Sequence, residues 1–329
     1  MRGAESPSAQ PELLSLGECM VELFGEEAPA YEPALTCTVG GDALNVLVAA
    51  ARLGARTGFI TRVGQDIFAE LLLGRWQTEG VDLSCVRVMP GFNGLYVITV
   101  EADGERSFTY YRAGDAASTL EPADLDAEYL RGARLVHTSG ITQAISASAR
   151  AAVRYLASLA TELGVKLSYD PNFRPKLGPA AEARLELRRL LPHLAVVLPS
   201  AGGDEALLWG TADPEAIATQ CLEAGCEVVA VKMGAQGCYV QNARESYRLP
   251  AVTGWSVVDT TGAGDAFDGA FLLAYLRQAP LGEAAQLANL VAAIKCGGRG
   301  ALGHLPTAEQ VARAWPRAYG EDPPAWLFA

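Results

Sequence analysis

Several signals that direct a chain to a common functional class are missing from this 329-residue sequence. Its three histidines lie far apart without metal-ligand spacing, so we expect each of them to be structural. The seven cysteines form no C-x-x-C pair, and their odd number predicts reduced thiols in a cytoplasmic protein. No apolar run reaches the length of a membrane-spanning helix, so no membrane partner is expected.

Positive charge is also scarce, because 26 Lys and Arg stand against 38 Asp and Glu and give a formal net charge of −12. A nucleic-acid surface needs a basic face, so this balance argues against a nucleic-acid partner. An anionic substrate would have to be held by individual Arg and Lys side chains and by helix N-termini. Half of the residues are hydrophobic, which is enough for a large core.

Three catalytic motifs are absent as well: a Walker A loop, an H-E-x-x-H metal motif and a G-x-S-x-G nucleophile elbow. One G-x-G-x-x-G pattern occurs at residues 298–303. It follows a predicted helix where a dinucleotide site requires a strand, and Pro306 interrupts the segment downstream. We therefore do not interpret this pattern as a dinucleotide-binding loop.

Strand-like and helix-like segments alternate along most of the chain. We expect strands at residues 13–17, 57–63, 135–139, 166–170, 195–199 and 227–232, and a hairpin formed by 238–241 and 245–249. We expect helices at residues 43–53, 67–79, 147–163, 180–191, 214–224, 266–278 and 283–296. This alternation predicts an α/β fold with three layers, a doubly wound and mostly parallel sheet covered by helices on both faces.

One section breaks the alternation. Residues 95–101 and 106–112 are rich in β-branched and aromatic side chains and flank an Asp103-Gly104 turn, which predicts a hairpin. With the mixed segment 19–37, which contains Pro29 and Pro33, this hairpin predicts a small inserted sheet. Its exposed edges are the expected contact of a homo-oligomer.

These segments give the expected organisation of the chain. The domain boundaries are 12–18, 38–91 and 119–320 for the main domain, 19–37 and 92–118 for a β lid, and 1–11 and 321–329 for the two tails. The first tail lacks the basic and apolar regions of a signal peptide, so we expect it to be a flexible tail.

The stretch from Val257 to Phe267 carries the strongest chemical signal. Val257 and Val258 predict a strand that leads into a tight turn and a helix. Gly262 and Gly264 allow the backbone to approach a ligand closely, and the free N–H groups at the helix start form a seat for an anion such as a phosphate. Asp265 stands at the edge of this seat, either as a general base for an attacking hydroxyl or simply as a helix cap.

Two arginines are ambiguous when each is considered alone. Arg174 follows a predicted strand, and Arg112 follows two tyrosines in the small inserted sheet. Either one is typical of a solvated loop residue. Together they place a guanidinium on each side of a cleft, which suits bidentate binding of a carboxylate or phosphate.

In this order, the motifs resemble the ribokinase-like (PfkB-type) carbohydrate kinases over nearly the whole chain. The sequence GGDALN at 40–45 resembles the family's sugar-binding signature, and DTTGAGD at 259–265 resembles its second signature. The resemblance implies a kinase that uses ATP and Mg²⁺. It also implies that the turn of Gly262, Ala263 and Gly264 is an anion hole, and that Asp265 is the catalytic base.

Within the family, the segments around Tyr96, Tyr110 and Arg174 are most like those of 2-keto-3-deoxygluconate kinases. This implies phosphorylation of that sugar acid to its 6-phosphate, with a sugar site of Gly41, Asn45, Tyr96, Tyr110, Arg112, Arg174 and Asp265. The implied nucleotide site adds Ser200, Lys232, Gly234, Gly237 and Asn289 to the glycine turn. A monovalent cation, K⁺, near Asp259 is implied by the family alone.

One departure from the family pattern concerns the loop after Ser200. The family usually places Glu three residues after this position, whereas here Gly203 stands there and Asp204 and Glu205 follow. Either the loop is longer or the acidic role is relaxed. The alternatives to the sugar-acid reaction are a fructokinase, a kinase for another keto-sugar acid or a nucleoside, and a non-catalytic sugar-binding regulator.

Overall fold

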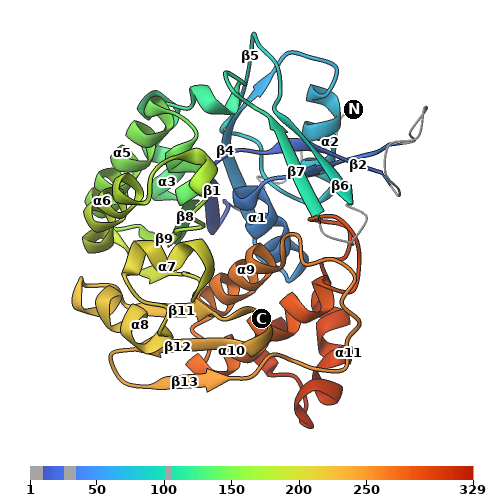
Figure 1. Cartoon of the computed structure of the whole chain (residues 1–329), viewed down its shortest axis with the longest axis vertical. Coiled ribbons are helices and arrows are strands. Elements are labelled where there is room, and N and C mark those ends of the chain that lie inside the picture. Colours follow the sequence, from blue (N-terminus) through green and yellow to red (C-terminus); the bar gives the residue numbers. More distant parts are fainter. Residues whose placement is uncertain (1–9, 26–34, 101–105, 329) are drawn as a thin grey trace, which may run out of the picture.

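The computed structural model describes residues 10–25, 35–100 and 106–328. Within these residues, the larger of two sheets has nine strands in the order β13-β12-β11-β10-β9-β8-β1-β4-β5 (Figure 1). All pairings in this sheet are parallel except those of β12, which runs opposite to β11 and β13 on either side of it. The strands are β1 (Leu13–Leu16), β4 (Thr57–Gly64), β5 (Val86–Met89), β8 (Leu135–Ser139), β9 (Lys166–Asp170), β10 (Val196–Val197), β11 (Val228–Lys232), β12 (Cys238–Asn242) and β13 (Ser246–Leu249).

The strands of the large sheet are apolar on both faces because helices cover both. Leu13 belongs to one core and Leu14 to the other, and Val228 and Val229 divide in the same way. The first core is closed by α1 (Asp42–Arg52), α2 (Ala69–Thr78), α9 (Ala263–Leu276), α10 (Leu281–Lys295) and α11 (Ala308–Tyr319). The second is closed by α3 (Ala127–Arg131), α5 (Ala147–Leu163), α6 (Ala180–Leu190), α7 (Ala206–Trp209) and α8 (Pro214–Glu223). The predicted three-layer α/β fold is therefore confirmed.

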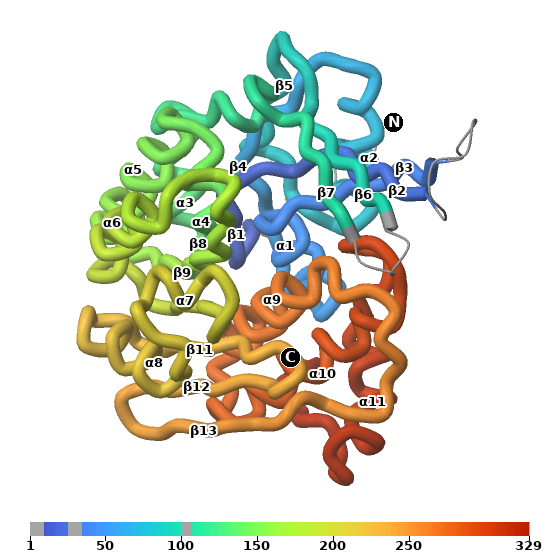
Figure 2. Tube along the Cα trace, viewed as in Figure 1, coloured from blue at the N-terminus to red at the C-terminus, as the bar shows by residue number. Residues whose placement is uncertain are grey.

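A second, smaller sheet has the order β3-β2-β6-β7 among the described residues. Its strands are β2 (Met20–Gly25), β3 (Leu35–Gly40), β6 (Leu95–Val100) and β7 (Arg106–Tyr111). The parallel pairing of β2 with β6 joins the two segments that the sequence assigned to the insertion. Figure 2 shows the four strands together on one side of the molecule, away from α5, α6 and α8.

The order of the large sheet reverses next to β1. From β1 the chain builds β4 and β5 on one side, and from β8 it builds β9, β10 and β11 on the other. The loops that leave the carboxyl ends of β1 and β8 therefore diverge, which opens a crevice at this point of a parallel sheet. The short helix α4 (Gly140–Ala144) begins directly after β8 at this crevice.

Some expectations fail or cannot be compared. Val257 and Val258 do not form a strand: both are exposed, and the amide of Val258 donates to Cys296 O in a neighbouring loop, 2.8 Å away. β5 and α11 were not predicted, although Thr307 and Gln310 form a capping box at the start of α11.

The Asp103-Gly104 turn, Pro29, Pro33 and the tail 1–9 lie outside the described residues. In the part that is described, no helix has the length and apolar character needed to cross a membrane.

A close helix crossing in the first core, between α1 and α9, suggests a stability test. A Cβ at Gly269 of α9 would lie 2.5 Å from Val46 O and 2.7 Å from the Cβ of Ala49, both on α1. We expect Gly269→Ala to lower the free energy of unfolding by about 1–3 kcal/mol, because the two helices would be forced apart. Thermal and denaturant unfolding of the purified variant would measure the loss.

Gly74 of α2 is the matched control, because no atom lies within 4 Å of a Cβ added there. Gly74→Ala should raise stability by roughly 0.5–1 kcal/mol through its better helix propensity. Equal stabilities of the two variants would show that the α1–α9 contact does not limit the fold.

Candidate functional site

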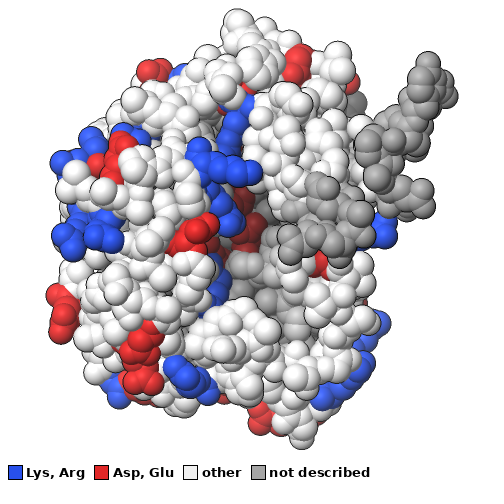
Figure 3. All heavy atoms as spheres, viewed as in Figure 1, with Lys and Arg blue, Asp and Glu red and all other residues white. Residues whose placement is uncertain are grey.

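A cavity of about 930 Å³ lies where the carboxyl ends of the large-sheet strands meet the small sheet. Figure 3 shows this hollow in the middle of one face, with both acidic and basic side chains gathered in it. The predicted site residues that line it are Gly41, Asn45, Tyr96, Tyr110, Arg112, Arg174, Ser200, Lys232, Gly262, Gly264 and Asp265. Residues from strand ends far apart in the sequence are thus brought to one place.

The first turn of α9 forms one wall of the cavity. Gly262 has a φ of 75° and occupies the N-cap position, and Ala263 and Gly264 follow as the first two helical residues. A left-handed φ strongly favours glycine at this position. The amides at such a helix start have no acceptor within the helix, and the helix dipole adds partial positive charge to them. This wall is therefore suited to an anion.

Asp265 is the third residue of α9, and its carboxylate accepts a hydrogen bond from Asn45 Nδ2 of α1 at 2.6 Å. Burial, with the negative charge of Asp42 nearby, raises the pKa of Asp265 to about 7, and the bond from Asn45 opposes this shift. Gly262 occupies the N-cap position of α9, and no side chain caps this helix. The interpretation of Asp265 as a helix cap is therefore wrong.

Beneath this turn, Lys232 lies in a buried ion cluster. Its ammonium donates to Asp170 at the end of β9 (2.8 Å) and to both carboxylate oxygens of Asp268 on α9 (2.9 Å each). Burial alone would lower the pKa of Lys232, but the charges of Asp170 and Asp268 outweigh it and raise that pKa. A Cβ at Gly264 would lie 3.9 Å from this ammonium. The cluster, which sequence reasoning missed, thus supports the first turn of α9 from below.

The opposite wall comes from the small sheet and the end of β1. Arg112 forms an ion pair with Glu18, and its guanidinium lies over the Tyr110 ring, 4.9 Å from the centroid. Tyr96 is 6% exposed, and its hydroxyl donates to Glu22 Oε2 at 2.5 Å. Two of the predicted sugar ligands are therefore engaged with neighbouring carboxylates.

Glu18 is a site residue that sequence reasoning did not identify. It follows Gly17 at the end of the first strand, a position that alone could have marked it. Burial raises the pKa of Glu18 to about 8, against the opposing charge of Arg112. Its Oε2 is buried and has no hydrogen-bond partner among the described residues. Glu18 therefore competes with any anionic ligand for Arg112.

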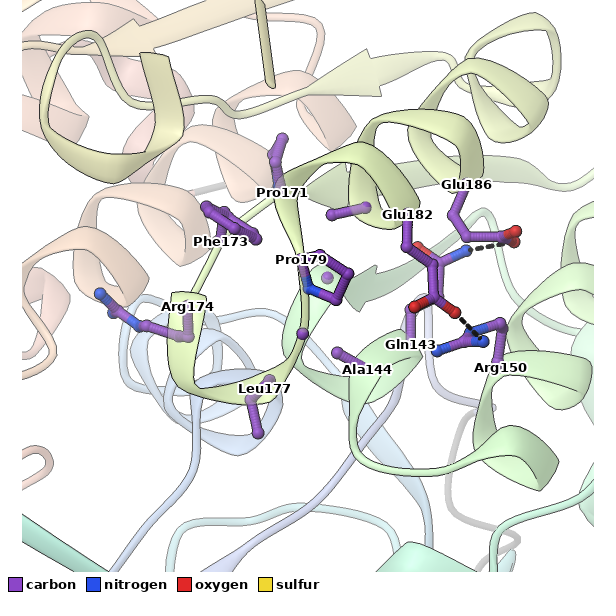
Figure 4. A pocket seen from close by; sticks show the side chains of 13 residues that line it. Gln143, Ala144, Arg150, Pro171, Phe173, Arg174, Leu177, Pro179, Glu182 and Glu186 are labelled. Carbon is purple, nitrogen blue, oxygen red and sulfur yellow. Dashed lines mark hydrogen bonds and ion pairs between the residues drawn. The ribbon is translucent and has the colours of Figure 1, made fainter. Parts of the chain in front are cut away.

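Arg174 differs from Arg112, because it is exposed and forms no ion pair within the described chain. It lies in the loop after β9, near Asn172, which has a φ of 36°. This loop separates the large cavity from a second pocket of about 40 Å³, which has room for little more than water. Figure 4 shows Arg174 pointing away from that pocket and from its Arg150–Glu182 ion pair.

The altered loop after Ser200 folds back on itself. Gly202 and Gly203 both have positive φ, and Glu205 returns to accept a hydrogen bond from the amide of Ser200 at 3.0 Å. Burial, with the charge of Asp170, raises the pKa of Glu205 to about 8. The loop therefore still brings a carboxyl group to the cavity, where Asp204 also lines the wall.

The remaining predicted nucleotide residues lie beside the cavity and do not line it. Gly237 packs so closely on the segment 249–251 that a Cβ would lie 2.0 Å from Leu249 O. Asn289 of α10 donates to Pro250 O at 3.2 Å, in the same segment. Gly234 accepts from the amide of Gly237 at 3.0 Å. These three residues thus meet around one loop.

The surroundings of Asp259 do not fit a monovalent cation. Its carboxylate accepts from the amides of Thr261 (2.8 Å) and Gly300 (2.7 Å), and its carbonyl oxygen accepts from Lys295 Nζ at 3.1 Å. For a divalent ion, the described residues contain no group of three or more potential side-chain ligands. The carboxylates of Asp204 and Glu205 fit Mg²⁺ that is held mainly by phosphates and water, as is usual for this ion.

Comparison with known proteins identifies the family. Residues 10–308 match the model of the pfkB family of carbohydrate kinases. This chain belongs to that family. It is 34% identical to a 2-dehydro-3-deoxygluconokinase of Thermoproteus tenax over 95% of this chain and 98% of that protein. It is 31% identical to fructokinase-2 of Solanum habrochaites over 91% of this chain and 94% of that protein.

A solved structure agrees with this assignment. An Escherichia coli protein that carries the name Ribokinase II, in complex with ATP and Mg²⁺, superposes with a TM-score of 0.85. It is 27% identical and covers 93% of this chain, which in turn covers 99% of it. The chain is therefore an ATP-binding pfkB kinase that transfers a phosphoryl group to a sugar hydroxyl.

The ion cluster of this pfkB kinase gives the next prediction. Lys232→Met would leave Asp170 and Asp268 buried without a cation, so we expect the free energy of unfolding at neutral pH to fall by about 3–5 kcal/mol. Lys166→Met is the matched control, since its pair with Glu227 is half exposed and should contribute at most about 1 kcal/mol. Denaturant unfolding compares them, and equal losses would contradict a structural role of the cluster.

Proposed function

We propose that this kinase phosphorylates the terminal hydroxyl of 2-keto-3-deoxygluconate with ATP and releases the 6-phosphate. The observation that carries the proposal is the pairing of two features across one cavity. Asp265 stands at the anion-binding turn of α9, and Arg174 faces the same cavity without a partner among the described residues. Similarity to the 2-dehydro-3-deoxygluconokinase of Thermoproteus tenax supports the same substrate.

In the proposed reaction, Asp265 acts as the general base. The sugar hydroxyl gives its proton to the carboxylate while its oxygen attacks the γ-phosphorus, and the bond from phosphorus to ADP breaks. Asn45 holds the carboxylate in place through its 2.6 Å hydrogen bond. The raised pKa of about 7 makes Asp265 a stronger base than an ordinary aspartate while leaving it substantially ionised near neutral pH.

The first turn of α9 is proposed to stabilise the negative charge that develops on the transferred phosphoryl group. The amides of Gly262 and Gly264 provide fixed donors, which require no reorganisation during the reaction. The amide of Ala263 already donates to Thr260 O at 3.1 Å and holds the turn in shape. Mg²⁺, held by the phosphates and by Asp204 or Glu205, would supply further charge neutralisation. Ser200 and the loop formed by Gly234, Gly237 and Asn289 are proposed to hold the remainder of the nucleotide.

Recognition of the acid group is assigned to Arg174, with Tyr110 of the facing small sheet and Arg112 directly after that sheet. A guanidinium binds a carboxylate through two parallel hydrogen bonds, and Arg174 has this capacity available. Arg112 already donates from one nitrogen to Glu18, and its remaining N–H groups are proposed to contact the substrate carboxylate. The small sheet is thus a lid whose contact with the substrate excludes water from the reaction. Its edge strands β3 and β7 are the surface we propose for homo-oligomer contact.

A second candidate, fructokinase activity, is favoured by one specific observation. The Glu18–Arg112 ion pair already neutralises one of the two arginines of the proposed acid clamp. Such a wall also suits a neutral ketose, whose hydroxyls bind both carboxylates and guanidinium groups. The similarity to fructokinase-2 of Solanum habrochaites agrees with this alternative.

The base assignment predicts the effect of Asp265→Asn. We expect turnover to fall by about 10²–10⁴ while the fold and ATP affinity are retained, because the amide has a similar shape but cannot take the proton. For the parent enzyme, kcat/KM should fall as the pH drops below about 7, where the pKa of Asp265 places its protonation.

Asp213→Asn is the control, since Asp213 caps α8 away from the cavity. It should leave turnover unchanged. If Asp265→Asn kept most of its activity, or if the acidic limb of the pH profile were missing, Asp265 would not be the base.

The acid-clamp assignment predicts that Arg174→Lys is harmful even though it keeps the charge. A lysine lacks the planar fork, so kcat/KM for the keto-acid should fall by an amount equivalent to about 1.5–3 kcal/mol. Fructose should be a poor substrate of the parent and nearly indifferent to the change. Arg188→Lys, on the exposed side of α6, is the matched control and should affect neither substrate.

These measurements separate the two candidates. Efficient turnover of fructose with little preference for the acid would reject the keto-acid assignment and leave sugar-kinase activity intact. No effect of Arg174→Lys on either substrate would place this arginine outside the binding site.

A further inference from the structure

A fully buried lysine at the end of α10 has no part in the mechanism above. Lys295 is 0% exposed, and its ammonium donates to the carbonyl oxygens of Asp259 at 3.1 Å and Gly298 at 3.4 Å. A buried ammonium is unfavourable unless polar groups surround it. Its position directly behind the anion-binding turn therefore calls for an explanation.

Two loops meet at this ammonium. The amides of Val258 and Asp259 both donate to Cys296 O, and the amide of Gly300 donates back to the Asp259 carboxylate. Gly262 lies against Ala301, where a Cβ would be 3.1 Å from the carbonyl oxygen. The 296–301 loop is thus the back wall of the turn that faces the cavity.

Electrostatics explains why a cation belongs between these loops. Gly262 and Gly264 of the turn line the cavity, while carbonyl oxygens of both loops, at Asp259 and Gly298, converge on the buried ammonium of Lys295. The C-terminal end of α10 adds partial negative charge, as does the buried carboxylate of Asp259. A positive charge here holds the carbonyls together and so keeps the amides aimed at the phosphoryl group.

We propose that the ammonium of Lys295 is a built-in cation that takes the place of the monovalent ion expected near Asp259, so that this kinase needs no K⁺. The inference rests on the proposed phosphoryl transfer at the anion-binding turn. Lys295 is a positioning residue, because it acts through the backbone of the turn and does not contact the substrate.

The first test uses the unaltered enzyme. Phosphorylation is measured in buffers whose only monovalent cation is tetramethylammonium, which is too large to enter between the loops, and then with K⁺, Na⁺ or NH₄⁺ at equal ionic strength. We expect the same kcat and the same melting temperature in all of them. Activation by K⁺ of roughly tenfold or more would overturn the proposal.

The second test removes the built-in cation. Lys295→Ala leaves the converging carbonyls without a positive charge, and kcat should fall by about 10²–10³, the range for a damaged oxyanion site. K⁺ or NH₄⁺, but not tetramethylammonium, should restore part of the activity and raise the melting temperature of the variant. Lys166→Ala, which removes an exposed lysine, should show neither loss nor cation dependence.

The melting temperature keeps this proposal separate from the choice of substrate. If the enzyme phosphorylated neither sugar, the proposed function would fail, while a K⁺-dependent melting temperature of Lys295→Ala would still support the cation site. If folded Lys295→Ala had the same activity and the same melting temperature in every salt, the proposal of a built-in cation would be overturned. If this variant and Lys295→Met both fail to fold in every salt, the effect of K⁺ on the kcat of the unaltered enzyme decides whether the proposal holds.

Discussion

The ammonium of Lys232 joins three parts of the chain that meet beneath the cavity. It binds Asp170 at the end of β9 and Asp268 on helix α9, and Lys232 itself is the last residue of β11. Because all three groups are buried, none can move without leaving a charge unpaired, which is strongly unfavourable. The position of α9, and with it the anion-binding turn and Asp265, is fixed by this cluster. The cluster also depends on the strand order of the large sheet, because β9 and β11, which carry Asp170 and Lys232, lie on either side of β10.

Much of the fold follows from the sequence because a parallel sheet covered on both faces leaves a simple pattern. Its strands are short, continuous apolar runs, and each is followed by a helix with a clear start and end. The site at the carboxyl ends of these strands follows from the same pattern. The resemblance to a family then assigned roles to residues such as Asn45, which the structure places against Asp265.

Other features depend on contacts that no local pattern contains. Val257 and Val258 have strand-forming side chains, but their segment pairs with the 296–301 loop and not with the sheet. The Glu18–Arg112 pair joins residues 94 positions apart, and the sequence around either residue does not predict that the other is its ion-pair partner. Lys232 ends a strand, where a phosphate ligand could stand, yet two distant carboxylates hold its ammonium. Contacts between residues far apart in the sequence decided each of these cases, and separate local motifs do not contain them.

The two sheets divide the work of the enzyme. Tyr96, Tyr110 and Arg112, which we propose to contact the sugar, come from the small sheet or directly after it, whereas Asp265 and its partner Asn45 belong to helices of the large one. A mutation in the small sheet can therefore change which molecule is accepted without disturbing the groups that transfer the phosphate. In evolution, such an enzyme can change the sugar that accepts the phosphoryl group while it keeps the same phosphoryl transfer. Relatives that share one architecture but act on different sugars are the expected result.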